Sequence, residues 1–343
     1  MTAIKLKPLA DQVMLITGAS SGIGLVTARA AARRGARVML VARNKQALSE
    51  AAAALRAEGH QADYAVADVA SIADVREAAT AAVARFGRID TWVNCAGVTI
   101  YAKLVDTPED EHQALFQTNY FGVVHGSLIA IQHLQEHGGA LITVGSIASD
   151  IPSPIMGAYA ASKHATKGFT ESLRIEINAD MLPISVTLIK PAGIDTPIAQ
   201  HAANHQEGEA LIPPSVYAPE LVADAILSAA VKPQRAITVG GVGRLQVLFG
   251  EHFPGLLAKF GGLAMPMLQD RNLPKTPGSN LHAPMPDGAE RSENQLGRPV
   301  SIYAVARKPA VTLGLLGLAV AGIGAAALTR RAQTSPKGKR HDR

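Results

Sequence analysis

The chain has 343 residues, of which 48% are apolar, 18% are charged and 4% are aromatic. This length can bury one large core or two modest ones, and the composition excludes a disordered chain and a polytopic membrane protein. A single cysteine excludes an intrachain disulfide and an all-cysteine metal cage.

The formal net charge of +5 is a property of the C-terminal tail. Residues 330–343 contain six basic side chains and one acidic side chain, so the preceding 329 residues are neutral. A neutral body does not attract a polyanion, and no nucleic-acid partner is expected. The chain opens with no apolar run long enough for a signal peptide, which predicts a cytoplasmic catalytic domain.

Apolar, β-branched runs alternate with alanine-rich stretches from residue 13 to about residue 240. The runs predict buried strands at 13–17, 37–41, 63–67, 91–94, 140–144, 185–189 and 236–239. The stretches predict helices at 24–34, 45–58, 72–86, 108–136, 157–178 and 218–231. Because parallel strands need crossover helices, this pattern predicts an α/β fold: a doubly wound, Rossmann-type, seven-stranded parallel sheet with helices on both faces. Residues 194–214 lack periodicity and are interpreted as a loop over the substrate.

A glycine-rich turn joins the first predicted strand to the first predicted helix. It runs from Thr17 to Gly24 with the sequence TGASSGIG. Glycines let the backbone approach a pyrophosphate closely, and the helix N-terminus offers free N–H groups to the anion. The turn therefore predicts a dinucleotide site that includes Gly18, Ser20, Ser21, Gly22, Ile23 and Gly24.

The end of the second predicted strand indicates which dinucleotide binds. An acidic residue about 20 residues after the glycines holds the ribose 2′-hydroxyl in NAD(H) sites, and it is missing here. Ala42 and Arg43 occupy this point, and a guanidinium can bind a 2′-phosphate with two hydrogen bonds. These residues favour NADP(H) over NAD(H); the alternative for Arg43 is an ordinary solvated charge at a strand end.

Tyr159 and Lys163 indicate proton-transfer chemistry, because they share one face of a predicted helix. A tyrosine pKa of about 10 is too high for a base at neutral pH, and we expect the Lys163 ammonium to lower it. Ser146 follows the fifth predicted strand, at the sheet edge where ligands bind in open α/β folds.

These motifs, in this order, resemble the short-chain dehydrogenase/reductase family over residues 10 to about 245. The resemblance implies that Tyr159 is the general acid in reduction and the base in oxidation. It implies that Lys163 holds the nicotinamide ribose, that Ser146 binds the reacting oxygen, and that Asn119 places a water in a proton relay. It also implies further cofactor contacts at Asp68, Val69, Asn94, Ala96, Gly97, Pro191, Ile194 and Thr196, in addition to Tyr159 and Lys163. The same resemblance implies a homodimer or homotetramer.

The substrate is expected to be an apolar or lipid-like alcohol or carbonyl compound. The segments expected to line its pocket include 98–101 and 152–156, and neither contains a charged residue. His201 and His205 are spaced like metal ligands on a helix, but their glycine-containing context is typical of a solvated lid. No metal site is expected.

The chain after the catalytic domain (1–244) divides into an amphipathic, irregular extension (245–308), an apolar segment (309–329) and a basic tail (330–343). Residues 310–328 are uncharged and lie between basic pairs. As a helix they would span about 28 Å, close to the hydrocarbon thickness of a bilayer. This predicts a transmembrane or membrane-associated helix. The alternatives are a soluble enzyme whose C-terminal helix packs on protein, and a non-catalytic, NADP(H)-sensing regulatory protein tethered to a membrane.

Overall fold

The computed structural model describes residues 4–301. The predicted segments 309–329 and 330–343 lie outside these residues. Among the helices of residues 4–301, none combines the length and the apolar character that crossing a bilayer requires.

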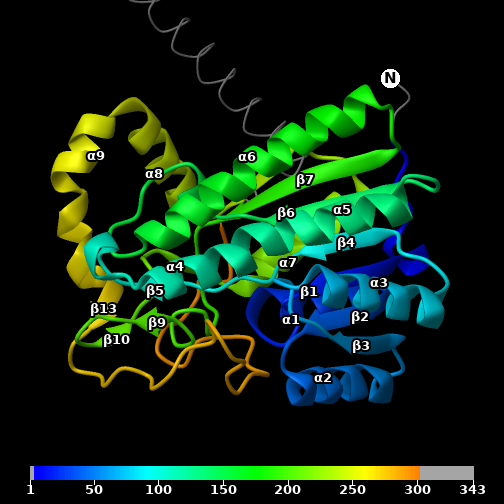
Figure 1. Ribbon diagram of the computed structural model, residues 1–343, viewed down its shortest axis with the longest axis horizontal. Helices are drawn as coiled ribbons and strands as arrows, with labels where there is room; N and C mark the ends of the chain where they lie inside the picture. The colour runs from blue at the N-terminus through cyan, green and yellow to red at the C-terminus, as the bar shows by residue number, and fades with distance from the viewer. Residues whose placement is uncertain (1–3, 302–343) are drawn as a thin grey trace, which may run out of the picture. The chain divides into compact units, whose positions relative to one another are not determined.

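A seven-stranded parallel sheet forms the centre of the described chain (Figure 1). Its strand order is β12-β7-β6-β4-β1-β2-β3. The strands are β1 (Val13–Thr17), β2 (Arg37–Ala42), β3 (Ala62–Val66), β4 (Thr91–Asn94), β6 (Gly139–Val144), β7 (Ile184–Pro191) and β12 (Ala236–Val239). The chain crosses over after β3, because β4 returns to pair with β1 on the side opposite β2. This reversal places the carboxyl ends of β1 and β4 around one crevice, the usual ligand position in this kind of sheet.

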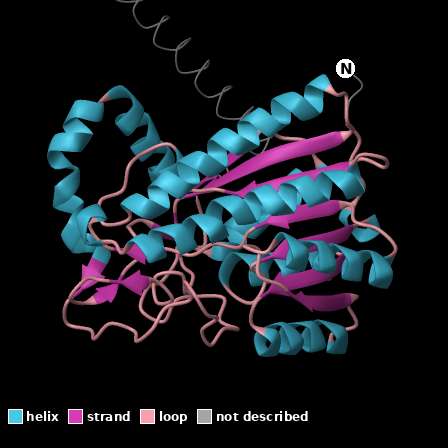
Figure 2. Cartoon of the chain, in the orientation of Figure 1, coloured by secondary structure: helices cyan, strands magenta, loops and turns pink. Residues whose placement is uncertain are grey.

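Helices cover both faces of the sheet, which confirms the predicted doubly wound architecture (Figure 2). One core contains apolar side chains of α1 (Gly22–Arg33), α2 (Lys45–Ala57) and α7 (Pro219–Val231). The other contains those of α3 (Ile72–Phe86), α5 (Gly122–Leu134) and α6 (Gly157–Ala179). Successive residues of β1 alternate between the two cores, as the two-residue period of a strand requires.

The helix predicted at 108–136 is not continuous. It is divided into α4 (Glu109–Phe116), a π-helical turn (Gln117–Phe121) and α5. Inside the turn, the carbonyl of Asn119 accepts a hydrogen bond from the Thr166 hydroxyl of α6. Tertiary contacts therefore reshape a stretch whose sequence alone predicts a single helix, and π-turns of this kind are frequent at functional sites.

Short strands and loops complete the carboxyl edge of the sheet. β8 (Gly193–Ile194) pairs with β11 (Val216–Tyr217), and β5 (Ile100–Tyr101) pairs with β9 (Ala203–Asn204). These pairings hold the region predicted as a substrate loop at 194–214 against the catalytic domain.

The C-terminal extension begins with α8 (Gly241–His252), so the boundary predicted at residue 244 falls inside a helix. α9 (Pro254–Phe260) and a 3-10 segment (Gly261–Leu268) follow, and then β13 (Gln269–Asp270) pairs with β10 (Glu209–Ala210). The rest of the extension, to residue 301, is irregular and returns along the catalytic domain (Figure 1).

Candidate active site

The proton-transfer residues lie at the carboxyl edge of the sheet, beyond β6. Ser146 is the N-cap of a short 3-10 turn, and its Oγ accepts a hydrogen bond from the Ala148 N–H at 3.0 Å. Tyr159 and Lys163 lie one turn apart on α6. The Nζ of Lys163 donates to the Val144 carbonyl at 3.1 Å and lies 5.6 Å from the centroid of the Tyr159 ring.

Burial shifts the pKa of Tyr159 and the pKa of Lys163. It raises the pKa of Tyr159 to about 12, although the hydrogen bond with Ser146 acts in the opposite direction. It lowers the pKa of Lys163 to about 8. The prediction that Lys163 lowers the tyrosine pKa is wrong for this structure, because desolvation is the largest effect on the phenol. At neutral pH the Tyr159 hydroxyl is protonated and can act as a proton donor.

Asn119 is buried near the proton-transfer residues and forms hydrogen bonds with two neighbouring segments of the chain. Its Oδ1 accepts from the Val98 N–H, and its Nδ2 donates to the Val98 carbonyl, both at 2.9 Å. Nδ2 also donates to Ser162 Oγ at 3.1 Å, on the helix that carries Tyr159. Asn119 is fully buried and lines neither of the two cavities described below. Asn94 is placed similarly, since its side chain bonds Trp92 and Ser127 inside the protein.

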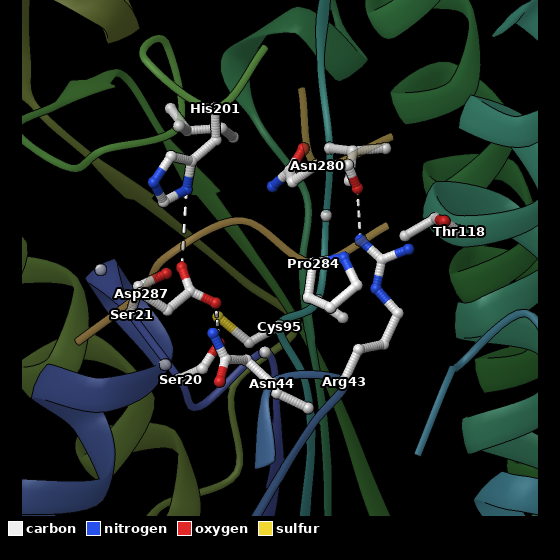
Figure 3. A pocket seen from close by; sticks show the side chains of 18 of the residues that line it. Ser20, Ser21, Arg43, Asn44, Cys95, Thr118, His201, Asn280, Pro284 and Asp287 are labelled. Carbon is white, nitrogen blue, oxygen red and sulfur yellow. Dashed lines mark hydrogen bonds and ion pairs between the residues drawn. The ribbon is translucent and has the colours of Figure 1, made fainter. Parts of the chain in front are cut away.

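A cavity of about 150 Å³, with a larger polar share than the second cavity described below, lies over the glycine-rich turn and the ends of β2 and β4; we call it the cofactor cavity (Figure 3). The predicted cofactor residues that line it are Gly18, Ser20, Ser21, Gly22, Ile23, Gly24, Arg43, Asp68, Val69, Ala96, Gly97 and Thr196. Two glycines are required for steric reasons. A Cβ on Gly24 would lie 2.1 Å from the Gly18 carbonyl oxygen, and one on Gly18 would lie 2.7 Å from Ala96 Cα. The turn therefore brings bare backbone to the cavity, as a pyrophosphate site needs.

Arg43 lines the cofactor cavity, but its guanidinium is already in contact with protein (Figure 3). It donates to the backbone carbonyls of Asn280 and Leu281, and it lies 3.8 Å from the Asp68 carboxylate. Both carbonyls belong to the irregular part of the extension, which the sequence analysis placed outside the site. Sequence reasoning missed several other residues that line this cavity, including Asn44, Thr118, His201, Asn280, Pro284 and Asp287. Residues 270–300 have no periodicity or motif that could have indicated their position.

A second cavity, of about 630 Å³, opens beside the first; we call it the substrate cavity. Ile23, Cys95, Gly97, Thr196 and Ile198 line both cavities. Ser146, Tyr159 and Lys163 line the substrate cavity together with the predicted Pro191 and Ile194. The proton-transfer residues thus lie in the wall of the substrate cavity, and this cavity adjoins the cofactor cavity along the five shared residues.

The walls of the substrate cavity are predominantly apolar. They include Ile147, Met156 and Ile212 of the catalytic domain, and Phe249 and Leu268 of the extension. Among the described lining residues, Lys163 is the only charged one. One polar side chain has no protein partner: the Thr99 hydroxyl is buried and makes no hydrogen bond. The cavity fits an apolar ligand with few polar groups.

The two lid histidines bind different partners. His201 Nδ1 lies 3.6 Å from the Asp287 carboxylate, whereas His205 Nε2 lies 2.8 Å from that of Glu111. Within residues 4–301, no group of three or more His, Cys, Asp or Glu side chains is arranged to hold a metal ion.

Known proteins are similar to this chain in sequence and in fold. Residues 12–207 match the family described as short chain dehydrogenase. The chain is 42% identical over 279 residues to the "Uncharacterized oxidoreductase YxnA" of Bacillus subtilis, covering 80% of this chain and 78% of the relative. It is 35% identical over 207 residues to "11-beta-hydroxysteroid dehydrogenase 1A" of Arabidopsis thaliana, covering 60% of this chain and 58% of that protein.

Two solved structures agree with this relationship. An alcohol dehydrogenase of Thermococcus sibiricus, complexed with 5-hydroxy-NADP, matches with a TM-score of 0.59 and 26% identity over 66% of this chain and 94% of its own. A short chain dehydrogenase/reductase of Burkholderia phymatum, in complex with NAD, matches with a TM-score of 0.67 and 24% identity over 73% of this chain and 96% of its own, which supports the fold alone. The chain belongs to the short-chain dehydrogenase/reductase family and is an oxidoreductase that acts on CH–OH groups.

Proposed function

We propose that this oxidoreductase uses NADP(H) to interconvert an alcohol and a ketone or aldehyde on an apolar or lipid-like substrate. The observation that carries the proposal is that Ser146, Tyr159 and Lys163 line the larger, apolar cavity, which shares wall residues with the cavity over the glycine-rich turn. When bound, NADP(H) supplies or accepts the hydride, and the protein supplies position and proton transfer.

In the direction of reduction, Tyr159 donates its proton to the carbonyl oxygen of the substrate. Its raised pKa supports this role, because the hydroxyl holds its proton at neutral pH. Ser146 donates a hydrogen bond to the same oxygen and stabilises the developing charge. Lys163 holds the nicotinamide ribose, while Asn119 orients the backbone at Val98 and, through Ser162, the helix that carries Tyr159.

The residues of the cofactor cavity fit a dinucleotide phosphate. The glycine-rich turn leaves no room for a Cβ at Gly18 or Gly24, and it precedes the N-terminus of α1. Arg43 supports a preference for the 2′-phosphate, because no acidic residue occupies its place at the end of β2. The pyrophosphate lies over the glycine-rich turn in this proposal, the adenine lies beside Asp68 and Val69, and the nicotinamide lies near Ile194 and Thr196.

An apolar substrate is supported by the cavity walls and by its volume of about 630 Å³, which is within the range of drug-sized ligand sites. The plant relative is named as a hydroxysteroid dehydrogenase, and a steroid is a substrate of this size and polarity. The buried Thr99 hydroxyl is available to bind one polar group of such a molecule.

Membrane association through residues 309–329, with the catalytic domain on the cytoplasmic side, is part of the proposal. Its support is the uncharged sequence of 310–328 and the exposed apolar side chains of the extension. Leu245, Phe253 and Leu263 are 66%, 53% and 76% exposed, on the same elements that line the substrate cavity. Full-length protein should partition into a membrane fraction, and a chain ending at Ser301 should do so less. Equal recovery of both chains from the aqueous fraction contradicts this part.

The catalytic proposal is tested by NADPH oxidation with a panel of ketones and aldehydes. Replacing Tyr159 with Phe should lower kcat by about 10²–10⁴-fold, because the proton donor is lost. Tyr64→Phe, on β3, is the matched control and should leave the rate unchanged. Undiminished turnover in the Tyr159 variant rules out the mechanism. NADPH binding without turnover of any carbonyl compound would favour the non-catalytic, cofactor-sensing alternative.

A further inference from the structure

Residues 280–298 of the extension form an irregular segment, which we call the strap. Asn280, Pro284 and Asp287 of the strap line the cofactor cavity (Figure 3). The strap therefore runs along the cofactor cavity between the glycine-rich turn and the end of β2. Both of these segments are far from the strap in the sequence.

The first part of the strap, residues 280–285, is bonded to the end of β2. Arg43 donates to the carbonyls of Asn280 and Leu281, and Asn44 Nδ2 donates to the Met285 carbonyl at 2.9 Å. Arg43 is the residue that would hold a 2′-phosphate, so the strap lies along the adenosine end of the cavity.

The next residues of the strap, 287–290, are bonded to the glycine-rich turn and α1. The Ser20 hydroxyl donates to the Asp287 carboxylate at 2.8 Å, and the Gly22 N–H donates to the Ala289 carbonyl at 2.9 Å. Arg29 of α1 pairs with Glu290 at 2.5 Å. The strap thus bridges two opposite sides of the cofactor cavity and engages donors that face the expected pyrophosphate.

The last part of the strap is held by one buried carboxylate. Asp195, whose side chain is fully buried, accepts hydrogen bonds from the Ser292 N–H at 3.0 Å, the Ser292 hydroxyl at 2.7 Å and the Gly297 N–H at 3.0 Å. It also pairs with Arg291 at 3.2 Å. Although burial acts to raise it, these hydrogen bonds hold the pKa of Asp195 below its ordinary value. Breaking this set would leave a buried charge without partners, which is costly.

The parts of the strap are held with unequal strength. The Leu281 side chain is buried in an apolar cluster, whereas residues 282–290 are mostly exposed, and Arg29 and Glu290 are each about a third exposed. Partly exposed ion pairs of this kind contribute little stability. Around residues 291–298 the contacts converge on a buried group. Residues 282–290 should open locally, while Leu281 and residues 291–298 stay in place.

We propose that residues 282–290 are a gate of the cofactor site, hinged on Leu281 at one end and on the part of the strap that Asp195 holds at the other. The gate opens to let the dinucleotide in or out and closes over it, which slows both binding and release. This inference rests on the proposed function, since that assigns the cavity to NADP(H). Asp287 and Glu290 are positioning residues, because they act through the strap.

The gate is tested with full-length protein by stopped-flow measurement of NADPH fluorescence. Asp287→Ala and Glu290→Ala each loosen the closed gate, and the double variant should raise the association and dissociation rate constants together, by about five-fold or more, with a smaller change in Kd. Asp224→Ala is the matched control: it removes the ion-pair partner of Arg34, the residue that follows α1, at 2.6 Å, and within residues 4–301 neither side chain forms an ion pair or a hydrogen bond with the strap. It should leave both rate constants unchanged.

Hydrogen exchange gives a second readout that needs no turnover. Without dinucleotide, the amide of Gly288, which donates to the Ser20 carbonyl, should exchange faster than those of Ser292 and Gly297. NADPH should slow the exchange of Gly288 most. Equal exchange across the strap contradicts the hinge. Unchanged rate constants, or faster dissociation alone, overturn the gate but leave the proposed function intact. Failure of every variant and of the wild type to bind NADPH or NADH overturns both.

Discussion

The cofactor cavity and the substrate cavity are covered by successive parts of one extension, and the two covers differ in chemistry. Residues 241–268 contribute Val242, Leu245, Phe249 and Leu257 to the apolar substrate cavity. Residues 280–298 contribute hydrogen-bonding groups to the cofactor cavity. The catalytic domain supplies the reacting groups, and the extension decides how each ligand is enclosed.

The largest effect is expected at Lys163, which lines the substrate cavity and in the proposed mechanism holds the nicotinamide ribose. Lys163→Met should abolish most turnover, by at least about 10²-fold, because the ribose contact and the charge are lost. The same change should raise the free energy of unfolding at pH 7 by about 2 kcal/mol, since a buried ammonium is removed. Kinetics and urea unfolding measure the two effects.

The pH dependence of stability provides the control for this variant. The folded chain releases the Lys163 proton at about pH 8, whereas an unfolded chain keeps it to about 10.5. Between these values the unfolded state binds more protons, so this group makes wild-type stability rise with pH. Lys163→Met should lack that rise. An identical pH dependence in both proteins contradicts the buried-ammonium interpretation.

Arg43→Ala should have the next largest effect, and it should change only the affinity for the dinucleotide in the cofactor cavity. NADPH affinity should fall about 10- to 100-fold with the loss of a bidentate contact to the 2′-phosphate. NADH affinity should stay within about two-fold, because NADH lacks that phosphate. Isothermal titration with both dinucleotides measures the ratio. An equal loss for both would mean that Arg43 acts by holding the strap at Asn280 and Leu281 instead.

Phe249→Ala tests the part of the extension, residues 241–268, that lines the substrate cavity. KM for an apolar ketone should rise about five- to ten-fold, because part of the buried contact area is lost, while NADPH affinity is unchanged. Phe260→Ala is the matched control, since Phe260 is 51% exposed and does not line the cavity. A similar rise in KM for both variants contradicts a specific role for Phe249.

The smallest effect is expected at Thr99. Its buried hydroxyl has no partner, so Thr99→Val should leave the melting temperature unchanged or slightly higher. KM should rise a few-fold only for substrates with a second polar group. A clear loss of thermal stability would show that the hydroxyl is satisfied in the folded protein.

The catalytic domain was predicted well because its signals are local and periodic. Three predicted strands, including 91–94, have the observed bounds, and the others differ by one or two residues at one or both ends. The π-turn at Gln117–Phe121 was missed, because it depends on contacts with Val98 and Thr166 from other elements. The strap was missed because hydrogen bonds to backbone carbonyls leave no pattern in the sequence.

The sequence by itself determined the sheet, the glycine-rich turn and the one-turn spacing of Tyr159 and Lys163, because periodicity and short motifs encode them directly. Only the tertiary structure decided the sign of the Tyr159 pKa shift, since desolvation depends on everything packed around the phenol. It alone also brought Asp287 to Ser20, across 267 residues of sequence. Such a contact depends on the path of the folded chain, and neither residue carries a local signal of it.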